Sequence, residues 1–219
     1  MRLIGITLGL IILTACVEDV GKDRVKATVE DVPEAKADAG SDEKAEAEKP
    51  TAAGDALKVD PSKSMIQALG AKVTATHPID FKDFEGEIKI ADGKVSGISF
   101  TVTMATLESD HPKLTEHLKT DDFFDVEKHG TSTFTSVEVR EGTDSAGFTH
   151  TVVGDLTVRG KTKRITFPAK VDMADAQVKA ETEFVLNRDD FGITYPGRAD
   201  DLIQDNVRMT IKFVAPRQA

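Results

Sequence analysis

The chain has 219 residues, with 38 acidic against 28 basic side chains and a formal net charge of −10. An acidic chain without a basic stripe is a poor partner for nucleic acid or for an anionic lipid surface. The single cysteine, Cys16, excludes an internal disulfide, so the core must be stable without one.

The first segment is an apolar run from Leu3 to Leu13 that follows one basic residue, Arg2. It is far shorter than the ~20 residues of a membrane-spanning helix, so residues 1–15 are predicted to be a secretory signal peptide. The run ends in Leu-Thr-Ala-Cys at 13–16, which resembles the bacterial lipobox. That resemblance implies a diacylglycerol on Cys16, and the alternative is a signal peptide that contains a cysteine by chance. Val17, where related sorting rules place aspartate, favours the outer membrane, facing the periplasm or the cell surface.

The second segment, residues 16–56, begins with this cysteine and continues mostly in Ala, Glu, Asp and Lys, without an aromatic side chain. Such a stretch buries too little apolar surface to offset its chain entropy. We therefore predict a disordered acidic linker, a plain tether that holds the folded part clear of the bilayer.

Residues 57–215 contain all eleven phenylalanines and the single tyrosine, and they are predicted to form one domain. Apolar and polar residues alternate along them with the period of half-buried strands. Eight strands are predicted, at 65–76, 84–91, 94–104, 132–140, 148–158, 164–172, 177–186 and 206–214. Pro112, followed by Leu114 and Leu118, predicts a short helix at 112–118 between the third and fourth strands. An all-β sandwich and a closed barrel both fit this pattern, and an eight-stranded barrel holds either side chains or one small ligand.

Six segments, in order and at natural spacing, resemble the YceI-like family of polyisoprenoid-binding, lipocalin-like proteins. They are Val59-Asp60-Pro61 with Ser64, Gly70-Ala71-Lys72-Val73-Thr74 with His77, Phe84-Glu85-Gly86-Glu87-Ile88, HLKTDDFFDV at 117–126, GDLTVRG at 154–160 with Lys163, and NRDDFGI at 187–193. The segment at 195–203 and Gly70-Ala71-Lys72 indicate a lipoprotein branch rather than the soluble periplasmic members, which leaves the ligand's identity open.

This resemblance implies an eight-stranded antiparallel lipocalin-like barrel that holds an isoprenoid or similar lipid-like molecule, without catalysis and without a cofactor. Inward-facing residues of the alternating strands are the candidate ligand contacts, and two aromatic residues after the last interior turn are expected to close one end. The first set is Ile98, Phe100, Phe134, Leu156, Phe167 and Phe184, and the closing pair is Phe191 and Tyr195. Each of them is also compatible with a core side chain that touches only protein.

The polar candidates are few. None of the five histidines forms an i, i+4 pair on a helix, and no metal site is predicted. His111 and His117 are expected on the surface or as helix caps. His77 is placed near a barrel mouth, where it would hydrogen-bond a polar head group. Arg188 is expected to pair with a loop carboxylate, Asp201 or Asp205, or alternatively to meet a ligand phosphate.

Three functions follow from these features. The first is an envelope lipoprotein that binds a lipid-like molecule in an apolar lumen for carriage, storage or protection. The second is a solid barrel that serves as an interaction or scaffold module. The third and weakest is an enzyme that acts on a bound lipid with His77 as base. The sequence leaves the ligand's chain length and head group open, and the oligomeric state too.

Overall fold

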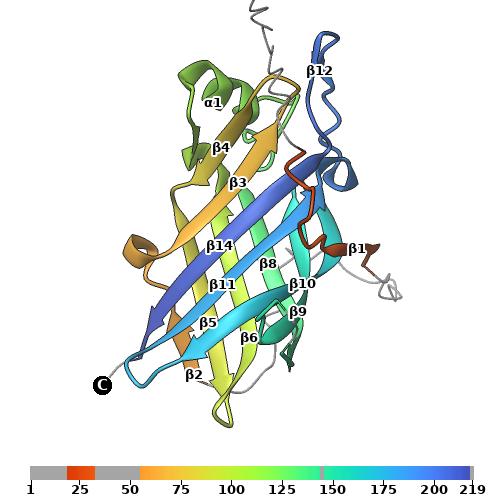
Figure 1. Ribbon diagram of the computed structural model, residues 1–219. Coiled ribbons are helices and arrows are strands. Elements are labelled where there is room, and N and C mark those ends of the chain that lie inside the picture. The colour runs from red at the N-terminus through yellow and green to blue at the C-terminus, as the bar shows by residue number, and fades with distance from the viewer. Residues whose placement is uncertain (1–18, 33–54, 144–145, 218–219) are drawn as a thin grey trace, which may run out of the picture.

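The computed structural model describes residues 19–32, 55–143 and 146–217. Strands dominate these ranges, and the antiparallel sheet curls into a half-barrel (Figure 1). The elements are β1 (Thr28–Asp31), β2 (Asp55–Lys58), η1 (Pro61–Lys63), β3 (Met65–Ala71), β4 (Thr76–Phe81), β5 (Phe84–Ala91), β6 (Lys94–Thr103), η2 (Met104–Thr106), β7 (Leu107–Ser109), α1 (Pro112–Lys119), β8 (Thr131–Glu141), β9 (His150–Val158), β10 (Lys161–Met173), β11 (Gln177–Asn187), η3 (Arg188–Phe191), β12 (Gly197–Arg198), β13 (Asp201–Leu202) and β14 (Asn206–Pro216). The predicted signal peptide, Cys16 and linker residues 33–54 lie outside the described residues. Within those residues, no helix has the length and hydropathy to cross a bilayer.

The all-β class and the short helix between β6 and β8 are confirmed, but the prediction of eight strands is wrong. The main sheet has twelve strands in the order β2-β5-β6-β8-β9-β10-β11-β14-β3-β4-β7, with β1 paired to β10 off this path. One difference is the segment predicted as a single strand at 65–76. It ends at a turn in which the Lys72 N–H donates to the Ala75 carbonyl, and β4 then runs back along β3. Pro78 and the neighbouring His77 hid this second strand, because proline is depleted in strands.

Short connections hold the curled sheet together. β4 pairs with β3 and β7. Only two residues separate β4 from β5, which pairs with β2 and β6. The Val59 N–H donates to the Gly86 carbonyl of β5, and the Asp60 N–H donates to the Val214 carbonyl of β14, each at 2.8 Å. The turn after β2 therefore bridges two strands that are not neighbours in the ladder.

The wall of the half-barrel splits between β10 and β11. Their ladder covers only residues 170–173 of β10 and 178–181 of β11. It stops short of Pro168, which has no N–H to donate, and the Thr182 hydroxyl donates to the Pro168 carbonyl at 2.6 Å instead. Beyond this point the two strands diverge and leave a seam.

Residues 19–32, here called the N-terminal strap, occupy that seam. β1 pairs with residues 163–166 of β10. On the other side, the Ala27 N–H donates to the Val185 carbonyl of β11 at 3.0 Å, and the Val185 N–H donates to the Val25 carbonyl at 2.9 Å. The prediction of disorder over 16–56 is therefore wrong for the strap and for residues 55 and 56 at the start of β2. The prediction failed because β10 and β11 supply backbone hydrogen-bond partners to the strap, and the strap's own composition does not reveal them.

Candidate binding cavity

An apolar cavity of about 110 Å³ lies inside the curled sheet. Of its 22 lining residues only Ser132, Asn187 and Arg188 are polar. Phenylalanines make up much of the rest. The rings of Phe167 and Phe184 stack with centroids 4.5 Å apart, and those of Phe100 and Phe134 do so at 5.3 Å. The interior is thus partly filled by stacked rings, and the remaining space is comparable to a dry apolar cavity of ~150 Å³ that binds benzene.

A larger cavity of about 550 Å³ lies outward of the first, between α1, the β3–β4 turn and the β12–β13 hairpin. We call it the outer cavity, and the first the inner cavity. The two share five lining residues, which form a neck between them: Ala68, Phe124, Arg188, Ile193 and Val207. Unlike the inner cavity, the outer one is lined by several charged and titratable side chains: Lys72, His77, His111, Lys113, His117, Arg188, Arg198 and Asp201.

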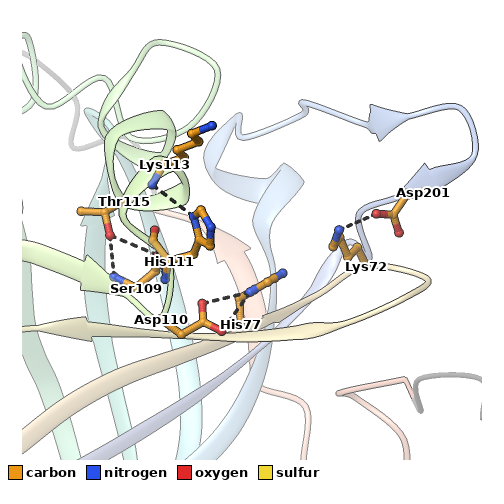
Figure 2. A network of polar contacts seen from close by, with 8 residues as sticks. All are labelled: Lys72, His77, Ser109, Asp110, His111, Lys113, Thr115 and Asp201. Carbon is orange, nitrogen blue, oxygen red and sulfur yellow. Dashed lines mark hydrogen bonds and ion pairs between the residues drawn. The ribbon is translucent and has the colours of Figure 1, made fainter.

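Figure 2 shows how part of this polar lining is held. Lys72 at the β3–β4 turn reaches Asp201 of β13, with Nζ 2.5 Å from Oδ2. The same carboxylate accepts from the Thr74 N–H at 3.2 Å and from the Thr74 hydroxyl at 3.0 Å. These hydrogen bonds, that from Lys72 foremost, lower the pKa of Asp201 below its ordinary value. The carboxylate therefore stays ionised and ties the hairpin to the turn.

The three histidines of the outer cavity have separate partners. His77 Nδ1 lies 3.0 Å from Asp110 Oδ1, and His117 Nε2 lies 2.7 Å from Asp122 Oδ2. His111 is the N-cap of α1, where its Nδ1 accepts from the Lys113 N–H at 3.2 Å (Figure 2). The capping role predicted for His111 is therefore confirmed. No group of three or more His, Cys, Asp and Glu residues suited to a metal ion occurs in the described part of the chain.

An aromatic cluster forms one wall of the outer cavity. The rings of His117, Phe123 and Tyr195 meet pairwise with centroids 5.0 to 5.4 Å apart. Two of these contacts are edge-to-face and the third is tilted, arrangements that aromatic pairs prefer, and the rings present apolar surface to the cavity. The outer cavity thus combines apolar walls with a polar rim.

Arg188 lies in the neck and is already satisfied by protein groups. Its side chain is 7% exposed, and Nη2 lies 2.8 Å from Asp205 Oδ1. Nη1 donates to the Ile193 carbonyl at 2.6 Å, and Nε donates to the Gln204 carbonyl at 3.1 Å. The predicted ion pair with a loop carboxylate is confirmed for Asp205, whereas Asp201 pairs with Lys72. Arg188 therefore fixes the loop between η3 and β14 at the neck.

The predicted contact residues divide between the two cavities. Phe100, Phe134, Leu156, Phe167, Phe184 and Phe191 line the inner cavity, Tyr195 and His77 line the outer cavity, and Arg188 lines both. Ile98 borders a smaller hollow of about 20 Å³ near Phe213, which shares Phe100, Phe134, Phe167 and Ile211 with the inner cavity. Sequence reasoning missed the cationic lining side chains Lys72, Lys113 and Arg198. They lie far apart in the chain and line one cavity only because the β3–β4 turn, α1 and β12 lie at one end of the sheet.

Comparison with known proteins gives a consistent result. A YceI-like domain matches residues 57–215. A UPF0312 protein of Ectopseudomonas mendocina is 36% identical over 92 residues, which are 41% of this chain and 47% of that protein. A UPF0312 protein of Pseudomonas putida is 35% identical over 125 residues, 53% of this chain and 64% of that protein. The chain thus spans about half to two thirds of these relatives' length.

Solved structures share the fold. Burkholderia cenocepacia BcnA superposes with a TM-score of 0.62 at 22% identity, over 72% of this chain and 99% of that one. A polyisoprenoid binding domain from Saccharophagus degradans, implicated in plant cell wall breakdown, superposes with a TM-score of 0.59 at 13% identity, over 74% of this chain and 98% of that one. At these identities the likeness shows the fold alone.

Proposed function

Because the chain belongs to the YceI-like family, we propose that it binds an isoprenoid or similar lipid-like molecule inside the curled sheet. The apolar tail lies in the inner cavity and the polar end lies in the outer cavity. The observation that carries this proposal is the neck, where five residues border both spaces. An amphiphilic chain is the class of molecule that matches an apolar interior followed by a polar rim.

The volumes set the scale of the ligand. The inner cavity, about 110 Å³, holds a group of five or six carbons, roughly one isoprene unit. The outer cavity, about 550 Å³, has room for several more. A longer polyprenyl chain requires either that the stacked phenylalanines separate or that part of the chain remains outside.

The energetics favour exchange over permanent capture. Burial of each methylene gains ~0.8 kcal/mol relative to water, which makes a prenyl chain far more stable in the cavity than in solution. A bilayer offers nearly the same gain. Transfer between membrane and cavity is therefore close to neutral in its hydrophobic component, as carriage, storage or protection of a lipid requires.

We further propose that Cys16 carries a lipid anchor and that the protein is held at the bacterial envelope, at the outer membrane. The support is the Leu-Thr-Ala-Cys sequence after a short apolar run. Stable anchoring takes more than one acyl chain, which a diacylglycerol supplies.

A titration with prenyl alcohols of increasing length tests the binding proposal. The purified mature chain is titrated with the C10, C15 and C20 alcohols in competition with a fluorescent fatty acid. We expect affinity to rise with each added isoprene unit and then to level off once the outer cavity is full. No displacement at any length would overturn the proposal and leave the solid-barrel scaffold as the better account.

A further inference from the structure

The end of the molecule at which the outer cavity opens also carries exposed apolar side chains. Val73 in the β3–β4 turn is 56% exposed, and Leu202 of β13 is 49% exposed. They are neighbours, because the Val73 N–H donates to the Leu202 carbonyl at 3.1 Å. Only two other large hydrophobic residues of the described ranges, Val25 and Val137, are exposed to a similar degree. We call Val73, Leu202 and the cationic side chains beside them the rim.

The rim also carries cationic side chains. Lys72, Lys113 and Arg198 lie there, and Asp201 is the single carboxylate that lines the outer cavity. Neither Lys113 nor Arg198 has an ion pair with any carboxylate of the described residues, although Asp200 lies on the same hairpin as Arg198. Lys72 is neutralised by Asp201, so Lys113 and Arg198 are the rim cations that remain available to lipid phosphates. Apolar side chains that enter the interface and cations that meet the phosphates are the contacts by which a protein face rests on lipid head groups.

The N-terminal strap begins at this same end. Val20 is buried, and its N–H donates to Oε1 of Gln204 at 3.1 Å. Gln204 lines the outer cavity, and its own N–H donates to the Ala71 carbonyl at the end of β3. The start of the strap is therefore packed directly against the mouth, at the end where Figure 1 shows α1, the β3–β4 turn and β12 together.

Chain length then fixes the reach of the anchor. Cys16 precedes Asp19 by three residues, and three extended residues span at most about 11 Å. A lipid on Cys16 thus holds the mouth of the outer cavity close to the head groups. The composition predicts a long tether, residues 16–56, between the anchor and the folded domain. The strap belongs to the fold from residue 19 onward, so only residues 17 and 18 separate Cys16 from it.

We propose that the rim is a membrane-docking surface and that the outer cavity opens onto the bilayer in which the protein is anchored. This inference rests on the proposed lipidation of Cys16. Val73 and Leu202 enter the interface, the cations lie among the phosphates, and a lipid passes from the membrane to the neck without crossing water. Because the strap connects the anchor to the mouth, a lipid on Cys16 keeps the mouth at the membrane surface.

Orientation is measured on the lipidated mature chain in vesicles of phosphatidylethanolamine and phosphatidylglycerol at three to one. Val73→Cys and Leu202→Cys are labelled separately with an environment-sensitive fluorophore. Val137→Cys is the matched control, since Val137 is 52% exposed midway along β8. We expect blue-shifted emission and quenching by lipid-linked quenchers at 73 and 202 only. Water-like emission at both rim positions, or equal quenching at 137, would overturn the proposal.

Uptake separates docking from binding. The double variant Val73→Asp with Leu202→Asp should slow lipid uptake from vesicles several-fold and leave its affinity for a C15 alcohol in solution unchanged. Val137→Asp should change neither. Equal uptake by the double variant would refute docking while leaving the cavity's function intact. If the unmodified chain does not bind the C15 alcohol in solution, the proposed function is refuted. The fluorophores at 73 and 202 still report whether the rim faces the bilayer.

Discussion

Ala68 offers the sharpest test of the neck, because its side chain borders both cavities and is 3% exposed. Ala68→Leu adds three carbons there and blocks passage to the inner cavity. Exclusion of the ~5 carbons that the inner cavity holds removes ~4 kcal/mol at ~0.8 kcal/mol per carbon. We therefore expect affinity for a C15 alcohol in solution to fall by up to about a thousandfold. Overpacking should lower the free energy of unfolding by about 1–3 kcal/mol.

The matched control is Ala180→Leu. Ala180 is also buried, at 6% exposed, and borders the hollow of about 20 Å³ that is separate from the neck. Its substitution should cost similar stability, measured by urea unfolding, and leave affinity within a few-fold. The competition titration used for the prenyl alcohols gives both affinities. If Ala68→Leu binds as tightly as the unmodified chain, the ligand does not pass the neck and the assignment of the inner cavity is wrong.

Three further predictions concern stability and are checked by urea unfolding. Gly154→Val should destabilise by several kcal/mol, because a Cβ at this position would lie 2.6 Å from Cε2 of Phe134 and 2.7 Å from the Thr135 carbonyl oxygen; an unchanged urea midpoint would contradict this close packing. Arg188→Met should cost about 1–3 kcal/mol, because it leaves the carbonyls of Ile193 and Gln204 without their donor, whereas the Asp205 carboxylate, 59% exposed, is hydrated again; unchanged stability would contradict the role given to this side chain. Burial lowers the pKa of His150, so the unfolded chain takes up a proton that the folded chain resists, and stability falls as the pH drops below the ordinary histidine pKa of ~6.5. His150→Phe should reduce the loss between pH 7 and pH 5.5, and an identical slope in both proteins would refute this cause.

Much of the fold was predictable from local pattern. The alternation along residues 206–214 and 177–186 marks β14 and β11, and Pro112 with two leucines marks α1, because side-chain period depends only on backbone geometry. The strap was missed although Val25, Ala27 and Val29 alternate with polar residues. The polar composition of the strap led to the prediction of disorder in spite of that pattern. The strap lies in a seam that forms near Pro168 and Thr182, more than 130 residues further along the chain.

The candidate site was predictable only in part. The phenylalanines of the inner cavity follow from strand alternation, since inward positions of a curled sheet converge. The outer cavity has no such signal. Lys72, Lys113 and Arg198 belong to a turn, a helix and a hairpin, and topology rather than local sequence brings them to one mouth. His77 and Tyr195 were named for the mouth from their places at a strand end and after the last interior turn, and their contact with a ligand stays a prediction.

The central claim is that the interior holds a lipid, and mass spectrometry of an organic extract tests it most directly. The protein is purified from the cells that make it, alongside Ala68→Leu, and the lipid recovered per chain is quantified. We predict a prenyl or similar apolar chain in near-stoichiometric amount from the unmodified protein and its loss from the variant. An extract without lipid from either, or equal lipid from both, would contradict the account.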